Sequence, residues 1–312
     1  MKEFFKKLLL FILPFSLYIG LIVIADPYNY WNHCRVLPIE TKLQVSKKLN
    51  PRLWKVIQFN RAPEPNVLFG DSRVDIIDTD RILELTGQDY FNFAYPGGTL
   101  DEVITSFWFA TEHIQLKNVI IGCNFNLYNK YNNKNLVKPA LGSAGMVRYI
   151  LNGANIKALA MSFYHIFTAK EVTIGNPDMD IEAFWKEQID GPAARFYKLY
   201  KYPDTYYMEL KKITEYCRSN NINLTFFIAP THTDLQAKID EFSLTEESER
   251  FRSDLRSIGN VIDYDYNTWL TSHYENFSDP FHLNIELDTI IINALIENKI
   301  AYGTYRDHEK SQ

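Results

Sequence analysis

The sequence predicts an α/β protein built on a parallel, doubly wound sheet of about five strands, preceded by a membrane-spanning helix. Three observations predict this class. Five short apolar runs alternate with longer helix-compatible stretches, the first run ends in Gly70-Asp71-Ser72, and a long apolar segment lies near the amino terminus. Strands that alternate with helices indicate a parallel sheet with helices on its faces.

The amino-terminal segment 8–25 is almost unbroken in its apolar character and is close to the minimum length for crossing a hydrocarbon core of about 30 Å. Lysines precede it and an aspartate follows it. The positive-inside rule therefore predicts a single-pass cell-membrane protein with a cytoplasmic amino terminus and an extracytoplasmic remainder. The alternative is a signal peptide cleaved after Ala25. Because the apolar run has no polar spacer before that point, residues 1–25 are expected to form a retained signal anchor.

Three further regions surround or follow the predicted sheet. Residues 26–65 are rich in Tyr, Trp, Asn and Pro without a long periodic segment, which predicts a membrane-proximal stem. The main domain is expected over 66–304. Within it, residues 127–203 are Asn- and Tyr-rich and broken by glycines, which predicts an insertion that is either a lid or substrate platform or a helical cap without substrate contact. The polar tail 305–312 is expected to be flexible.

Apolar, β-branched and aromatic residues define the five expected strands, which are 66–69, 90–94, 118–122, 223–229 and 261–264. Helices are expected over 100–113, 205–220, 234–257 and 285–300. Thr99 and Glu102 have the spacing of a capping box, which places a helix start at residue 100.

Composition excludes several classes of function. The net charge of −5 gives no basic surface of the kind that binds nucleic acid, so no nucleic-acid partner is expected. Cys34, Cys123 and Cys217 lack the spacing of a zinc site or a disulfide framework, although a Cys34–Cys217 bond stays open. No metal-ligand spacing is present among His113, His165, His273 and His308, so no metal or cofactor is expected.

Ser72 is the candidate nucleophile. The buried strand 66–69 leads into Gly70, whose freedom allows a sharp turn that presents the Ser72 hydroxyl at the carboxyl edge of the sheet. A serine hydroxyl is a poor nucleophile alone and needs a histidine base, an acid and oxyanion donors. Asp279 stands three residues before His282, a spacing that can bring its carboxylate to Nδ1 and leave Nε2 to take the Ser72 proton.

These pieces occur in the order of the SGNH (GDSL-type) hydrolase superfamily, which the sequence resembles. The matching blocks are Gly70-Asp71-Ser72, Asn92-Phe93-Ala94-Tyr95-Pro96-Gly97, Gly122-Cys123-Asn124 and Asp279-Pro280-Phe281-His282. The resemblance implies a flavodoxin-like three-layer fold, with Ser72 as nucleophile, His282 as base and Asp279 as the residue that orients it. It also implies an oxyanion hole made by the Ser72 and Gly97 amides and the Asn124 side chain.

The match has two departures, and two further residues are candidates for contact with substrate. Phe125 stands where the third block usually has an acid, and Ala94 replaces a glycine in the second. Arg73 could steer an anionic substrate or pair with a nearby aspartate, Asp75 or Asp78. His232 follows the fourth strand, so it is expected at the same sheet edge as a substrate contact.

Anchored members of this superfamily resemble alginate-type O-acetyltransferases and D-alanyl transfer proteins. The resemblance implies an O-acyltransferase, with acetyl as the expected group, that modifies an extracytoplasmic or cell-envelope glycan through acyl-Ser72. The acyl donor would be delivered by a multispanning membrane O-acyltransferase. The alternatives are a carbohydrate esterase that uses the same triad and a non-catalytic glycan-binding or scaffold subunit of an envelope complex.

Overall fold

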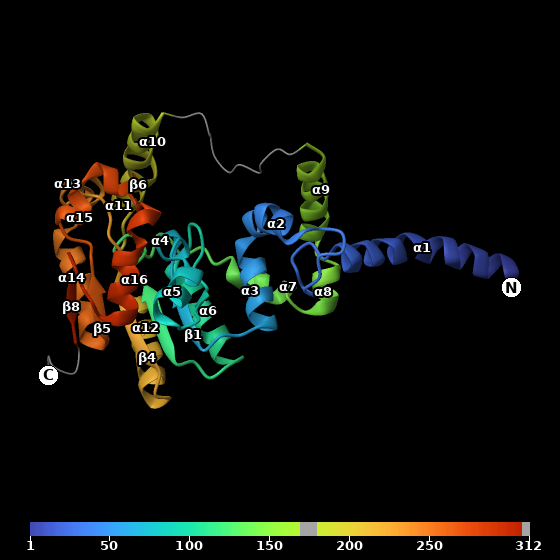
Figure 1. Cartoon of the computed structure of the whole chain (residues 1–312), viewed down its shortest axis with the longest axis horizontal. Coiled ribbons are helices and arrows are strands. Elements are labelled where there is room, and N and C mark those ends of the chain that lie inside the picture. The colour runs from blue at the N-terminus through green and yellow to red at the C-terminus, as the bar shows by residue number, and fades with distance from the viewer. Residues whose placement is uncertain (169–179, 308–312) are drawn as a thin grey trace. The chain divides into compact units, whose positions relative to one another are not determined.

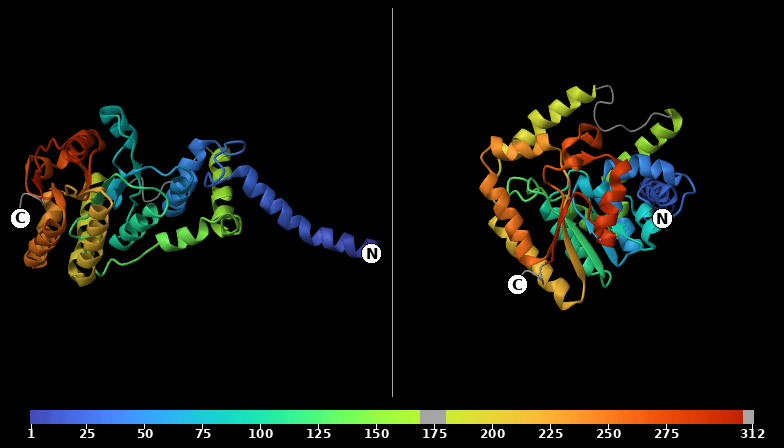
Figure 2. Two further views of the ribbon diagram at one scale, coloured as in Figure 1. Left: turned by 90° about the horizontal axis from the view of Figure 1, so that it is seen from below. Right: turned by 60° about the vertical axis from the view of Figure 1, so that its left-hand side comes forward.

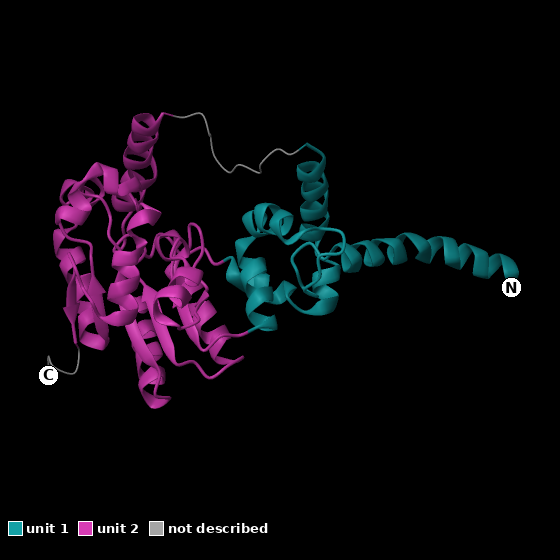
Figure 3. Ribbon diagram, viewed as in Figure 1, with its two compact units in different colours: residues 1–62, 136–177 teal, residues 63–135, 178–312 magenta. Residues whose placement is uncertain are grey.

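The computed structural model describes residues 1–168 and 180–307, and the chain divides into two compact units (Figures 1 and 3). Unit 1 comprises residues 1–62 and 136–177, and unit 2 comprises residues 63–135 and 178–312. Each unit is therefore built from two separate stretches of the chain.

These units cut across the regions expected from the sequence. The segment 127–203, expected as one insertion, is divided between both units, and its described part is helical rather than loop-rich. The region 26–65, expected without a long periodic segment, contains the eleven-residue helix α3 (Pro51–Arg61). Asn50 accepts a hydrogen bond from the Leu53 amide at 3.0 Å, and Pro51 fills the first turn. This Asn-Pro pair is a standard helix start, and it was the overlooked signal.

Unit 1 is helical, and its longest helix is α1 (Lys2–Ala25). Its 24 residues span about 36 Å, and the helix is long and apolar enough to cross a membrane. The remaining helices are α2 (Ile39–Lys42), α3, α7 (Val137–Ser143), α8 (Met146–Ile150) and α9 (Gly153–Thr168), with a π-helical turn at Leu43–Lys47.

A buried ion pair lies at the carboxyl end of α1. Asp26 and Lys42 are both fully buried, and the Lys42 Nζ lies 3.4 Å from Asp26 Oδ2. The Asp26 carboxylate also accepts hydrogen bonds from the amides of Tyr30 and Trp31, while Lys42 donates to Asn29 Oδ1 at 3.1 Å. Burial lowers the pKa of Lys42, and Asp26 opposes that effect. Both charges therefore need each other to remain buried.

Unit 2 contains a six-stranded sheet in the order β2-β1-β3-β4-β5-β8. The strands are β1 (Asn66–Phe69), β2 (Phe91–Asn92), β3 (Asn118–Gly122), β4 (Asn223–Ile228), β5 (Asn260–Asp263) and β8 (Thr304–Arg306). The first five are parallel and follow the flavodoxin-like order, which confirms the predicted fold class.

The strand β8 corrects the expected flexible tail. Residues 304–306 pair antiparallel with β5, with Tyr305 opposite Ile262, so the sheet gains an edge strand there. The rest of the expected tail, 308–312, lies outside the described residues.

Helices cover both faces of the sheet, as Figure 2 shows. On one face lie α6 (Leu100–Thr111), α12 (Asp204–Ser219) and α14 (Thr245–Ile258), and on the other lie α5 (Thr79–Thr86) and α16 (Asp288–Glu297). The predicted Thr99–Glu102 capping box is present at the start of α6. The expected helix 234–257 is two helices, α13 (Thr233–Glu241) and α14, because Ser243 turns the chain with a φ of 55°.

The residues of the central strands β1, β3, β4 and β5 alternate between the two faces and are mostly buried, whereas β2 is half-buried and β8 is exposed. Leu68, Ile120, Phe227 and Ile262 belong to one apolar cluster with Ile292 of α16. Such near-continuous apolar strands are typical of a parallel sheet covered on both sides. This core holds the carboxyl ends of β1 to β4 at one edge, where the polar motifs lie.

Candidate active site

The nucleophile turn follows β1 and begins the short helix α4 (Ser72–Asp75). Its geometry depends on small residues beneath it. A Cβ atom on Gly70 would lie 2.5 Å from Val74 Cγ2, and one on Gly122 would lie 2.3 Å from the same atom. Val74 is 1% exposed, so it fills the space that the two glycines leave open. The turn therefore sits directly on the ends of β1 and β3.

The second block holds this turn in place. The Asn92 side chain donates to the carbonyls of Val74 at 2.8 Å and Ile77 at 3.1 Å, which satisfies backbone acceptors at the end of α4. The Tyr95 amide donates to the Gly70 carbonyl at 3.1 Å. A Cβ on Gly98 would lie 3.1 Å from that same carbonyl oxygen, so the second block packs closely against the nucleophile turn.

Asp279 and His282 meet Ser72 through one continuous set of contacts. His282 Nε2 lies 2.7 Å from Ser72 Oγ, and His282 Nδ1 lies 2.7 Å from Asp279 Oδ2. Asp279 Oδ1 also accepts the backbone amides of Phe281 at 2.8 Å and His282 at 3.1 Å. The structure thus brings together the three residues that the sequence proposed. Ser72 and His282 lie 210 positions apart in the chain.

A hairpin and a neighbouring helix fix the acid and the base. Asp279 ends β6 (Phe277–Asp279) and pairs across the hairpin with His282 of β7 (His282–Leu283). The carbonyl of Pro280, between them, accepts the backbone amide of His232 at 3.0 Å. The hairpin is therefore attached to the start of α13.

His232 lies at the expected sheet edge, where its side chain is buried. It is 5% exposed, its Nδ1 accepts the Asp234 amide at 3.2 Å, and its ring packs against Trp185, Tyr274 and Phe277. Burial lowers its pKa against the opposing effect of Asp234. The side chain caps α13, and the backbone amide is attached to the hairpin that carries Asp279 and His282. Contact between His232 and a substrate stays a prediction.

Arg73 pairs with neither Asp75 nor Asp78. Its guanidinium donates to both carboxylate oxygens of Asp71, with Nε 3.1 Å from Oδ1, and to Asn126 Oδ1 at 2.9 Å. Burial by itself would lower its pKa, but Asp71 raises it above the usual value, so the group stays charged. The side chain is 3% exposed, and its two partners, Asp71 and Asn126, are side chains of the protein.

The expected oxyanion donors lie on three turns at the same edge. The Ser72 amide begins α4, and Gly97 adopts a φ of 58°, a region that favours glycine. The Asn124 side chain donates to the Ala229 carbonyl at 2.7 Å and accepts the Ala229 amide at 3.1 Å. Asn124 therefore joins the ends of β3 and β4, and its second amide hydrogen is the one left for an oxyanion.

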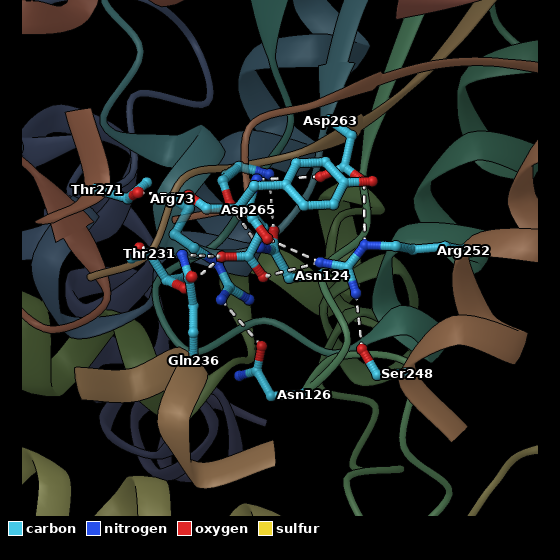
Figure 4. A network of polar contacts seen from close by, with 12 residues as sticks. Arg73, Asn124, Asn126, Thr231, Gln236, Ser248, Arg252, Asp263, Asp265 and Thr271 are labelled. Atoms are coloured by element: carbon cyan, nitrogen blue, oxygen red, sulfur yellow. Dashed lines mark hydrogen bonds and ion pairs between the residues drawn. The ribbon is translucent and has the colours of Figure 1, made fainter. Parts of the chain in front are cut away.

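A network of buried charges lies beside these turns (Figure 4). Asp265 accepts hydrogen bonds from Thr231 and Gln236, and Arg252 donates to Asp263 at 3.1 Å. Burial raises the pKa of Asp265, while Arg252 lowers it. The sequence did not suggest Asn126 or Asp265 as part of this region. The signal for Asn126 was its position two residues beyond Asn124, after a buried strand.

A small apolar hollow lies next to the triad. Arg73 and Ile76, which follow Ser72, and Phe281 and Leu283, which flank His282, contribute to its lining. Its volume is about 30 Å³.

Among the described residues, no group of three or more His, Cys, Asp or Glu side chains could hold a metal ion. The three cysteines are all free thiols; they are Cys34, Cys123 and Cys217.

Comparison with known proteins gives structural similarities at low sequence identity. No family model matches the chain, and no curated protein is significantly similar to it in sequence. A GDSL-like lipase from Bacteroides thetaiotaomicron is 11% identical, with a TM-score of 0.43, over 83% of this chain and 98% of that one. A protein from Bacteroides fragilis assigned as an acylhydrolase is 12% identical, with a TM-score of 0.40, over 77% and 91%. The functional proposal therefore depends on the geometry of the site.

Proposed function

We propose that this chain is an SGNH-type serine O-acyltransferase that works through an acyl-Ser72 intermediate. The observation that carries the proposal is the chain of contacts from the Asp279 carboxylate through the His282 ring to the Ser72 hydroxyl, each 2.7 Å at its shortest. This arrangement fixes the tautomer of the histidine whose Nε2 can accept the serine proton. Its order along the chain is that of the SGNH resemblance.

The residues support a two-step reaction. Ser72 Oγ attacks the acyl carbonyl while His282 Nε2 takes its proton, and the oxyanion is stabilised by the Ser72 and Gly97 amides and the Asn124 amide. The tetrahedral intermediate collapses, and His282 gives the proton to the leaving group. An acceptor hydroxyl then loses its proton to His282 and attacks acyl-Ser72. The bond from the acyl carbon to Ser72 Oγ breaks to give the new ester, and His282 returns the proton to Ser72 Oγ.

The size of the apolar hollow supports a short acyl group. Its volume is about 30 Å³, and it is lined by chain neighbours of Ser72 and His282, so it favours a short group such as acetyl. Ile76 and Leu283 would contact its methyl group, and a longer chain would have to displace them.

The amino-terminal helix supports an acceptor outside the cytoplasm. With α1 as a single-pass anchor and the positive residues inside, unit 2 would act on a glycan or cell-envelope polymer. A cytoplasmic acyl donor would then require a carrier across the membrane, which a multispanning O-acyltransferase partner supplies. A carbohydrate esterase is the second candidate, because water could replace the sugar hydroxyl at the same residues. A non-catalytic glycan-binding subunit is the third.

The decisive experiment uses the full chain in detergent micelles with p-nitrophenyl acetate. Release of p-nitrophenol, with a mass increase of one acetyl group on the wild type and none on Ser72→Ala, supports the serine mechanism. Absence of both on a folded wild-type protein rejects it and favours the non-catalytic candidate. Adding an acetyl-free envelope oligosaccharide then separates transfer from hydrolysis: acetylated sugar supports the transferase, and acetate alone supports the esterase.

A further inference from the structure

Arg73 is a buried cation next to the nucleophile that takes no part in the reaction steps above. Its side chain is 3% exposed, and its guanidinium donates to the side chains of Asp71 and Asn126, which lie on turns at the sheet edge. Burying a guanidinium is costly unless it is paired and hydrogen-bonded. The contacts of Arg73 must therefore compensate for the cost of burying its charge.

Those contacts join two turns that belong to different strands. Asp71 follows β1 and precedes Ser72, and its carboxylate receives two guanidinium nitrogens of Arg73. Asn126 follows β3 and lies two residues beyond Asn124. Its Oδ1 receives a third nitrogen at 2.9 Å. The planar, forked guanidinium fixes both directions at once, which a single ammonium group cannot do.

The joined turns carry two of the expected oxyanion donors. One is the Ser72 amide, which immediately follows Asp71, and the other is the Asn124 side chain. Figure 4 shows Arg73 in one polar network with Asn124, Asn126 and Asp265, with Arg252 on the right-hand side. Asn124 is itself held to Ala229 after β4. β1 and β3 pair as far as Phe69 and Ile121, and Arg73 links the two turns beyond these last paired residues.

We propose that Arg73 is a positioning residue, which preassembles the oxyanion hole by holding the turn after β1 to the turn after β3. This inference rests on the proposed serine mechanism. A donor that stabilises an oxyanion acts on the transition state, so its misplacement lowers kcat and leaves KM nearly unchanged. A residue that bound the substrate would instead raise KM.

The test compares Arg73→Lys with Arg81→Lys, a surface control whose exposed guanidinium pairs with Glu84. With p-nitrophenyl acetate, Arg73→Lys should lower kcat by about 10- to 100-fold, since removing one donor outright costs about 10² to 10³. KM should stay within twofold. Asn126→Ala, which removes one acceptor and leaves Arg73 in place, should show the same pattern more weakly.

A second variant separates positioning from simple stability. In Arg73→Lys/Asn126→Asp, the lysine faces carboxylates on both turns, so part of the lost kcat should return. If Arg73→Lys lowers only the melting temperature and its kcat stays within twofold of wild type, the inference is overturned. A rise in KM at constant kcat also overturns it in favour of substrate binding. An inactive wild type would reject the proposed function instead, so the two failures are distinguishable.

Discussion

Replacing Asp279 by asparagine tests the orientation of His282 most directly. In the folded protein, Asp279 Oδ1 accepts two backbone amides, those of Phe281 and His282, and Oδ2 faces His282 Nδ1 at 2.7 Å. In the variant, the amide oxygen would keep the position of Oδ1, because only an acceptor satisfies both backbone N–H groups. The amide nitrogen would then face Nδ1 and donate to it.

This donation forces the imidazole into the wrong tautomer. With Nδ1 as acceptor, the proton of the neutral ring lies on Nε2, which can no longer take the proton of Ser72 at 2.7 Å. The same exchange in a serine triad lowers kcat by about 10⁴, which corresponds to about 5.4 kcal/mol of transition-state stabilisation. Stability should change little, since the two backbone hydrogen bonds survive. Asp279→Ala should lose both, at roughly 1.5 kcal/mol each.

The assay measures kcat for p-nitrophenyl acetate and the rate of Ser72 acetylation by intact mass, alongside a thermal melt. Asp78→Asn is the matched control, since Asp78 Oδ1 likewise accepts two backbone amides, at the start of α5. We expect that control to retain the wild-type kcat. A folded Asp279→Asn protein that keeps more than a tenth of wild-type kcat would refute the tautomer argument.

Three further predictions concern the surroundings of the triad. Gly70→Ala should destabilise the fold by about 1–3 kcal/mol through its contact with Val74, and Val74→Ala in the same chain should relieve part of this loss in a denaturant titration. Ile76→Ala should raise the rate ratio of p-nitrophenyl butyrate to acetate by about tenfold, and an unchanged ratio would exclude the hollow as the acyl site. His232→Asn should flatten the pH dependence of the free energy of unfolding. Burial lowers the His232 pKa, so the wild-type protein loses stability as the pH falls below about 6.5, where the histidine is protonated in the unfolded chain. Equal slopes of unfolding free energy against pH in the two proteins would contradict this.

The sequence contained enough to predict the sheet and the meeting of Ser72, Asp279 and His282. Local chemistry determined these features: apolar runs specify buried strands, and the parallel crossovers bring every strand end to one edge. The Asp279–His282 spacing needed only a tight hairpin to become a contact. The roles of Gly97 and Asn124 as oxyanion donors stay predictions, with Asn124 already using one amide hydrogen on Ala229.

The rest depended on tertiary contacts that no local pattern records. Arg73 could not be matched to Asn126 from the sequence, because their pairing follows from which turns lie side by side. The pairing of β8 with β5 joins residues about forty positions apart, and Tyr305 stands in a polar stretch that resembles a tail. The glycines after residue 136 made that segment resemble a loop in the sequence. Its short helices were not predicted, because tertiary packing rather than helix propensity stabilises them.

The buried ion pair after α1 bears on how the chain is processed. Ala25 and Asp26 are both fully buried, so the bond between them is inaccessible to a peptidase once unit 1 has folded. Cleavage there before folding would create an ammonium group on Asp26 itself, beside the buried Lys42. Two cations would then share one buried carboxylate, an arrangement that is unfavourable. The buried packing around Asp26 is therefore compatible with an uncut chain that keeps α1.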